Sequence, residues 1–146
     1  MKNVFQLIGI GTILLAFLIP QISNAQIQVG DTHEGGIVFF IFGENKDHGL
    51  VCSKADLGSY DWTDAITACE AYKGEGFTDW YLPSEDELNM MYTNLHEKRI
   101  GAFTHSHYWN SLEDPYGIAW FQNFFNGKRE NWDQGDLFLV RAVRVF

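Results

Sequence analysis

Apolar residues are distributed along the chain as one long run near the start and several shorter, patterned segments after it. The long run extends from Val4 to Ile19 behind a single cation, Lys2, and is followed by Pro20 and the small residues of "SNA". This order is typical of a secretory signal peptide cleaved after Ala25. A membrane-spanning helix is the weaker interpretation, because the run is short for a bilayer and no basic flank follows it.

Two short apolar segments behind the signal have the composition of β-strands. They are "GGIVFFIF" (35–42) and "LVCS" (50–53), and the turn cluster "GENKDHG" separates them. β-Branched and aromatic side chains favour strands, and a turn cluster between two such runs favours a hairpin. We therefore expect the two segments to pair.

A helical period replaces these runs in the next part of the chain. In "DWTDAITACEAYK" the apolar residues recur at three and four positions, the spacing of one helical face, at Trp62, Ala65, Ile66, Cys69 and Tyr72. Asp61 is placed to cap the start of this helix, and Gly74 lies at its end.

A second helix is predicted behind "FTDWYLP". Ser84 and Glu87 have the spacing of a capping box, and Glu85 and Asp86 fall in the first turn, where the helix dipole stabilises anions. This reading gives every acid after Pro83 a structural role, so it competes with the interpretation of the same carboxylates as catalytic groups. The apolar stripe behind them is Leu88, Met91, Tyr92 and Leu95.

After Ile100 no long helical stripe remains. Short aromatic runs alternate with Gly, Asn, Asp and Pro, which indicates an antiparallel sheet with sizeable loops. The closing segment "LFLVRAVRVF" predicts a terminal strand deep in a sheet, beside "GIVFFIF". Arg141 and Arg144 lie in this strand, where they could pair with nearby acids.

Composition narrows the possible partners. Removal of residues 1–25 takes away Lys2 and no acid, so the formal charge becomes −10, and residues 26–146 have the length of a single domain. A surface this acidic repels nucleic acid and anionic lipid. No second apolar run in the mature chain is long enough for a membrane span.

The two cysteines permit two interpretations. Export would place Cys52 and Cys69 in an oxidising compartment, where an even number of cysteines favours a disulfide. The alternative is a pair of buried free thiols, because the sequence does not show whether the Cβ atoms meet.

Catalytic and metal-binding motifs are weak. "HEGG" and "HEKR" both lack the second histidine of a zinc-protease motif, and no nucleophile elbow is present. His105 and His107 could form a metal pair, but two ligands are too few without distant partners.

Residues suited to ligand recognition are concentrated in the later half of the chain. Sugar binding needs flat apolar faces and forked polar groups. Trp132 is the leading candidate, since it is expected on a polar loop, whereas Trp62, Trp80, Trp109 and Trp120 are expected in the core. The amides could instead close turns. The full candidate set is Asn110, Glu113, Asn123, Asn126, Glu130, Asn131, Trp132 and Asp133.

Five blocks in order resemble one known family: "GGIVFFIF…HGLVCS", "GFTDWYLPSEDELNMMY", "YWNSLE", "AWFQNFFNG" and "VRAVRVF". Together they are similar to the DUF1566 family, also called the Lcl C-terminal domain family. This resemblance implies an α+β, C-type lectin-like fold with two helices, small antiparallel sheets and paired N- and C-terminal strands.

Departures from related groups limit what the resemblance implies. The calcium-binding triplets of C-type lectins are absent, and "ENWDQGD" (130–136) has the right residue types in the wrong order. We therefore expect no cofactor, although calcium binding without a lectin motif stays open. "WYLPSE" is also similar to a segment of the formylglycine-generating enzymes, whose late cysteines this chain lacks.

The sequence thus favours a secreted, non-catalytic module that recognises a glycan or a surface protein at a bacterial surface or in the periplasm. A protein-interaction or self-assembly module is the alternative. An enzyme related to the formylglycine-generating branch is a third interpretation.

Overall fold

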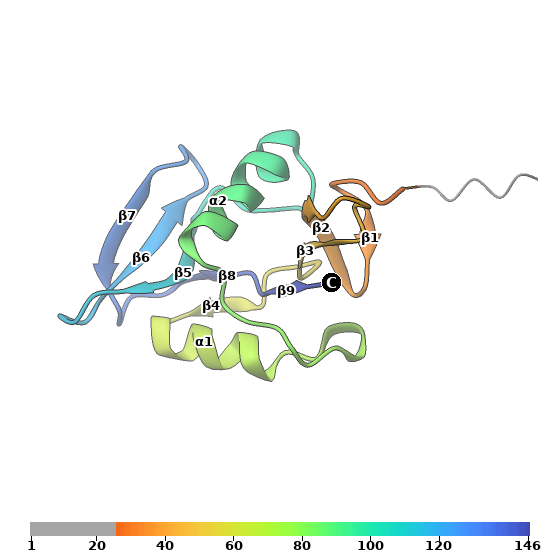
Figure 1. Cartoon of the computed structure of the whole chain (residues 1–146). Coiled ribbons are helices and arrows are strands. Elements are labelled where there is room, and N and C mark those ends of the chain that lie inside the picture. Colours follow the sequence, from red (N-terminus) through yellow and green to blue (C-terminus); the bar gives the residue numbers. More distant parts are fainter. Residues whose placement is uncertain (1–25) are drawn as a thin grey trace, which may run out of the picture.

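The computed structural model describes residues 26–146, so the predicted signal peptide and its cleavage after Ala25 lie outside the described part of the chain. The fold is α+β, as predicted, with two helices and two small sheets (Figure 1). Neither described helix has the length and apolar content needed to cross a membrane.

The first sheet contains the predicted hairpin. Its order is β1 (Thr32–His33), β2 (Gly36–Phe42), β3 (His48–Cys52) and β9 (Val143–Val145). β2 and β3 pair antiparallel, with Ile37 opposite Cys52 and a register shift between Val38 and Phe40. The prediction of this hairpin is confirmed.

The second sheet carries the later half of the chain. Its order is β4 (Gly58–Tyr60), β8 (Phe138–Val140), β5 (His107–Glu113), β6 (Ile118–Asn123) and β7 (Arg129–Asp133). The β5–β8 contact is parallel, so this sheet is mixed rather than purely antiparallel. β7 forms the outer edge, at the left of Figure 1.

The prediction of one terminal strand beside "GIVFFIF" is wrong. The segment divides into β8, which pairs with β4 and β5, and β9, which pairs with β3. Between them, the buried Arg141 turns its guanidinium toward the carbonyls of Ser53 and Gly101, at 3.0 Å from each. The N- and C-terminal strands β1 and β9 therefore share a sheet but do not pair with each other.

Both predicted helices are present. α1 (Trp62–Ala71) begins at Asp61, whose side chain accepts from the Asp64 N–H at 2.8 Å. α2 (Glu85–Asn94) begins at Ser84 with the predicted capping box. Short 3₁₀ turns follow each helix, η1 (Gly74–Gly76) and η2 (His96–Lys98). In Figure 1, α1 lies below the second sheet and α2 above it.

The core consists of two apolar clusters, one against each helix. The first includes Trp62, Ala65 and Cys69 of α1, packed with Trp109 and Phe121 of the second sheet. The second includes residues of α2, β3, β5 and β9, namely Leu88, Met91, Cys52, Tyr108 and Val143. Each helix therefore buries the face that its apolar period predicted.

The disulfide prediction is wrong, because Cys52 and Cys69 are both free and buried. Successive side chains of a strand point to opposite faces. Val51 of β3 packs into the α1 cluster with Cys69, so Cys52 faces the other cluster, toward α2. Burial also raises the pKa of each thiol to about 12, which keeps both protonated.

Candidate functional site

A hollow of about 730 Å³ lies against the outer strands of the second sheet. It takes residues from β5, β6, β7 and β8 and from the turn between the last two. The lining residues are His107, Trp120, Phe121, Arg129, Glu130, Asn131, Trp132, Asp136 and Phe138.

The floor of the hollow is aromatic. The His107 ring centroid lies 4.8 Å from that of Phe121 and 5.0 Å from that of Phe138, and the Phe121 and Phe138 centroids are 4.8 Å apart. Phe138 also packs on the buried Trp109, with centroids 4.3 Å apart. The floor is thus the outer surface of the α1 core, which holds it rigid.

Strand pairing places Trp132 above this floor. β7 pairs antiparallel with β6, so that Glu130 lies opposite Phe121 and Trp132 opposite Ala119. Cross-strand partners project to the same face of a sheet. Trp132 lies in strand β7 and not in the loop predicted from its polar neighbours, because this segment pairs with β6. It is 58% exposed, and all five residues of β7 are exposed. Trp120 and Asn131 form the intervening pair and project to the other face of the sheet. They also line the hollow, so residues from both faces of the β6–β7 hairpin border it.

Three polar side chains at the hollow are open to a ligand. Within residues 26–146, the side chains of Glu130, Asn131 and Asp136 make no hydrogen bond or ion pair. Arg129 differs, because its Nη1 lies 3.3 Å from Glu85 Oε1 and 3.6 Å from an Asp86 oxygen at the start of α2. The hollow therefore offers two carboxylates and an amide beside an aromatic plane.

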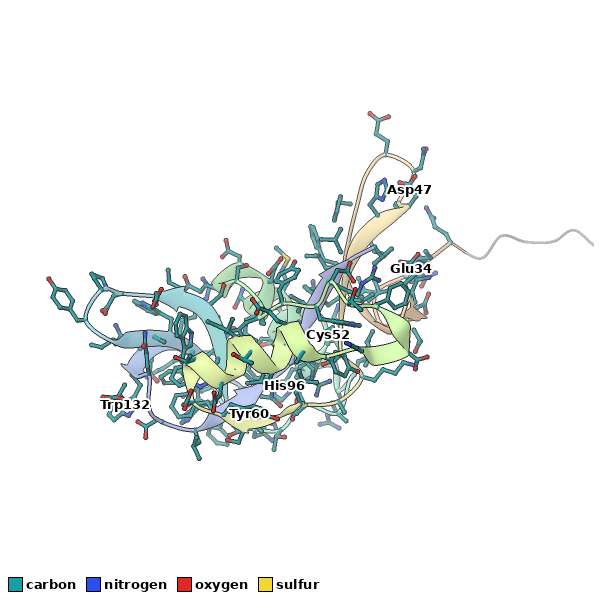
Figure 2. The ribbon with its side chains drawn as sticks, turned by 90° about the horizontal axis from the view of Figure 1, so that it is seen from below. Glu34, Asp47, Cys52, Tyr60, His96 and Trp132 are labelled. Atoms are coloured by element: carbon teal, nitrogen blue, oxygen red, sulfur yellow. The ribbon has the colours of Figure 1, made fainter. Side chains whose placement is uncertain are left out.

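A second hollow of about 480 Å³ adjoins the first around the same tryptophan. Trp132 and Asn131 line both, and the second is completed by Gly117, Ile118, Asp133 and Tyr116. Tyr116 is 86% exposed at the tip of the β5–β6 hairpin. Trp132 thus lines two neighbouring cavities. Figure 2 shows this residue at the left of the molecule.

The structure gathers half of the sequence candidates here and disperses the rest. Glu130, Asn131 and Trp132 line the first hollow, and Asp133 the second. Glu113 borders a separate hollow of about 400 Å³, where its Oε2 accepts from Gln134 Nε2 at 3.3 Å.

Two candidate asparagines close a turn, which was the alternative interpretation, and a third is buried within β5. Asn123 accepts from the Phe125 N–H and Asn126 from the Lys128 N–H, both in the β6–β7 turn. Asn110 accepts from the Leu112 N–H and has no exposed surface, so it is placed outside any surface site.

Several residues at the hollows escape detection from sequence. Trp120 was expected in the core but is only partly buried and borders the first hollow. His107, Asp136, Phe138 and Tyr116 also line these cavities. In the sequence, an aromatic or apolar residue beside β7 looks the same as a core residue. Asp136 and Tyr116 lie in turns, where a polar or aromatic side chain is a weak indication of a binding site.

The acids beside Pro83 do not converge on a site. Asp79 pairs with Arg144 at 2.7 Å, and Glu85 pairs with Arg129. Glu87 accepts from the Ser84 N–H and from the Tyr81 hydroxyl, both at 2.8 Å. Each of these carboxylates therefore has a structural partner, which is either the cap of α2 or an arginine.

The described residues contain no group of three metal-ligating side chains. His107 lies on the floor of the first hollow, whereas His105 contacts His96, with ring centroids 5.0 Å apart, in another cavity. The two histidines therefore do not share a site.

Comparison with known proteins gives one assignment. No curated protein matches the chain. The Lcl C-terminal domain model matches residues 44–144, from the β2–β3 turn into β9, and so includes both helices and both hollows. Because this match covers well over half of the chain, the protein belongs to the Lcl C-terminal domain family.

Proposed function

We propose that this protein is a secreted, non-catalytic binding module that recognises glycans at a bacterial surface, with the β7 hollows as its binding site. The observation that carries the proposal is Trp132, exposed between two adjoining cavities and beside hydrogen-bonding side chains that have no partner in the described part of the chain.

The chemistry of the two hollows suits a sugar. A pyranose ring presents an apolar C–H face, which packs on an indole plane, and hydroxyl groups around its edge, which need forked acceptors and donors. Trp132 supplies the plane, and Glu130, Asn131 and Asp136 supply the polar groups. The rigid floor under them limits the conformational entropy lost on binding.

Recognition without turnover is supported by the state of the remaining acids. The carboxylates near Pro83 hold helix α2 and two arginines, so they support the fold rather than a reaction. Export to the cell surface rests on the signal-like residues 1–25.

The test is binding of the purified protein to a glycan array with and without calcium, followed by titration of a bound glycan. Trp132→Ala is expected to weaken binding roughly tenfold, about 1.4 kcal/mol, because the stacking plane is lost. Phe125→Ala is the matched control, since Phe125 is 76% exposed but borders neither hollow.

Two results would overturn the proposal. One is the absence of glycan binding above background in both calcium conditions. The other is an equal loss of affinity in Trp132→Ala and Phe125→Ala, which would place recognition outside the hollows.

A second candidate function, protein interaction or self-assembly at the cell surface, is favoured by the open edge of β7. In the described chain β7 pairs with β6 on one side and with no strand on the other. An exposed edge of this kind is a template for pairing with another chain.

A further inference from the structure

The outer edge of β7 presents an ordered set of backbone groups. Hydrogen bonds from Asn123 N to Lys128 O (2.8 Å) and from Gln134 N to Gly117 O (3.2 Å) lie at the two ends of the β6–β7 ladder. Bonded and non-bonded pairs alternate in an antiparallel ladder. Between these ends, the backbone N–H and C=O groups of Glu130 and Trp132 therefore bond to β6. The backbone groups of the residues on either side of them point away from β6, toward the open edge.

The outward residues, whose backbone groups point to the open edge, are Arg129, Asn131 and Asp133. Across the described residues, their N–H groups and the carbonyls of Arg129 and Asn131 have no backbone partner outside the strand, whereas the Asp133 carbonyl accepts from the Asp136 N–H at 3.2 Å. Since β7 is exposed along its whole length, another extended segment has room to pair there.

Two copies of the β7 sequence, "RENWD", can face each other in antiparallel orientation with opposite charges paired. If Asn131 lies opposite Asn131 of a second copy, Arg129 lies opposite Asp133 and Glu130 opposite Trp132. This register sets a cation against an anion at both ends. It also aligns the outward residues of one copy with those of the other, which hydrogen bonding requires.

We propose that the protein forms a two-fold symmetric dimer in which β7 of one copy pairs antiparallel with β7 of a second, with Asn131 on the axis. A two-fold contact closes on itself, so it removes the open edge without propagating into a filament. This inference concerns assembly and does not depend on the nature of the ligand.

The pairing also joins the two binding surfaces. Glu130 and Trp132 project to the face that carries the aromatic floor. In the dimer, Glu130 of the second copy lies beside Trp132 of the first, so each first hollow gains a carboxylate from the other copy. Arg129 and Asp133 project to the opposite face, where Arg129 already contacts Glu85 and keeps further N–H donors for Asp133 of the second copy.

Disulfide trapping tests the register. Residues opposite each other in a bonded antiparallel pair have Cα atoms about 5.5 Å apart, within the range for a disulfide. Asn131→Cys is therefore expected to give a covalent homodimer on mild oxidation. Arg129→Cys is the control. In the proposed register the two cysteines of this variant lie about four residues apart along the strands, roughly 13 Å, so the variant is expected to run as a monomer on a non-reducing gel.

A backbone variant tests the pairing without a crosslink. The Asn131 N–H faces away from β6, so Asn131→Pro removes no bond of the ladder and suits an edge strand. We expect the native protein to sediment as a dimer at tens of micromolar and about 0.15 M salt, where its net charge is screened beyond roughly 8 Å. Asn131→Pro is expected to sediment as a monomer with an unchanged circular dichroism spectrum.

The proposal is overturned if the native protein is monomeric under these conditions, or if Asn131→Cys gives no covalent dimer. It is also overturned if Arg129→Cys crosslinks as readily as Asn131→Cys, since the register would then be wrong. If Asn131→Pro does not fold, the comparison of the two cysteine variants still decides the outcome.

Discussion

Arg141 shows how the fold treats a charge in its interior. Its side chain has no exposed surface, and its Nε and Nη2 lie 2.8 and 2.7 Å from Asp56 Oδ1. Asp56 Oδ2 in turn accepts from the Tyr108 hydroxyl at 3.0 Å, and Phe103 packs under the guanidinium at 4.0 Å. A buried ion needs partners of this kind, because an unpaired charge in the core costs several kcal/mol.

The cysteines are a second residue-scale case with a direct test. We expect neither Cys52 nor Cys69 to react with a maleimide in the native protein, since both are buried and their pKa values are raised to about 12. Both are expected to react once the protein is unfolded in guanidinium without a reducing agent, as measured by intact mass. Protection of both thiols in the denaturant, relieved by reduction, would instead indicate a disulfide.

At this scale the sequence predicts chemistry better than position. The exposure of Trp132 follows from its polar neighbours and is confirmed. The burial of Asn110 and the partial exposure of Trp120 do not follow, because each depends on which strand lies next to it. Residue type does not distinguish a tryptophan under a helix from one at a sheet edge.

Helices and hairpins are specified locally and were therefore predictable. The Asp61 cap, the Ser84–Glu87 box and the β2–β3 hairpin each depend on residues close in sequence. The partners of β8 and β9 are not specified locally, since an apolar strand fits many neighbours. The parallel contact of Tyr108 with Leu139 is one such pairing that periodicity does not reveal.

The capping box of α2 gives an element-scale prediction. Ser84→Ala is expected to lower the free energy of unfolding by about 1 kcal/mol, because the Glu87 N–H loses its acceptor at the helix start. Ser84→Asp restores an acceptor and is expected to remain close to the native value. Chemical denaturation measures all three proteins.

Ser59→Ala is the matched control for that measurement. It removes an exposed hydroxyl that makes no hydrogen bond within residues 26–146, so we expect little change. Equal destabilisation by Ser84→Ala and Ser59→Ala would contradict a specific role for the box.

At the scale of the whole molecule, one arginine links segments that are distant in sequence. Arg144 of β9 pairs with Asp79 at 2.7 Å and with Glu34 at 3.2 Å, and its guanidinium lies 3.9 Å from the centre of the Phe77 ring. These contacts connect the last strand to the β1–β2 turn and to the segment before α2. The C-terminal residues thus fasten the first sheet to the rest of the fold.

This linkage predicts a particular response to acid. The hydrogen bond from Arg144 holds the pKa of Asp79 below its usual value of 3.8. A lowered carboxyl pKa stabilises the folded state above the unfolded pKa, and this contribution is lost as the pH falls through the folded pKa. Asp79→Asn is therefore expected to be less stable than the native protein at pH 7, with the difference shrinking below about pH 3.8.

Denaturant midpoints measured from pH 7 to pH 3 test this expectation. Glu44→Gln is the control, because Glu44 is exposed in the β2–β3 turn and forms no ion pair within the described residues. A stability difference between Asp79→Asn and the native protein that stays constant over this range would contradict the assigned role.

The position of the C-terminus has a practical consequence for how this domain can be presented. The C-terminus follows β9 of the first sheet and lies away from β7 (Figure 1). A tether joined at the C-terminus, whether a solid support or a fluorescent fusion, leaves the Trp132 surface pointing away from the attachment point. Immobilised copies would therefore display that surface uniformly outward, and a flexible tether would leave neighbouring copies free to meet edge to edge.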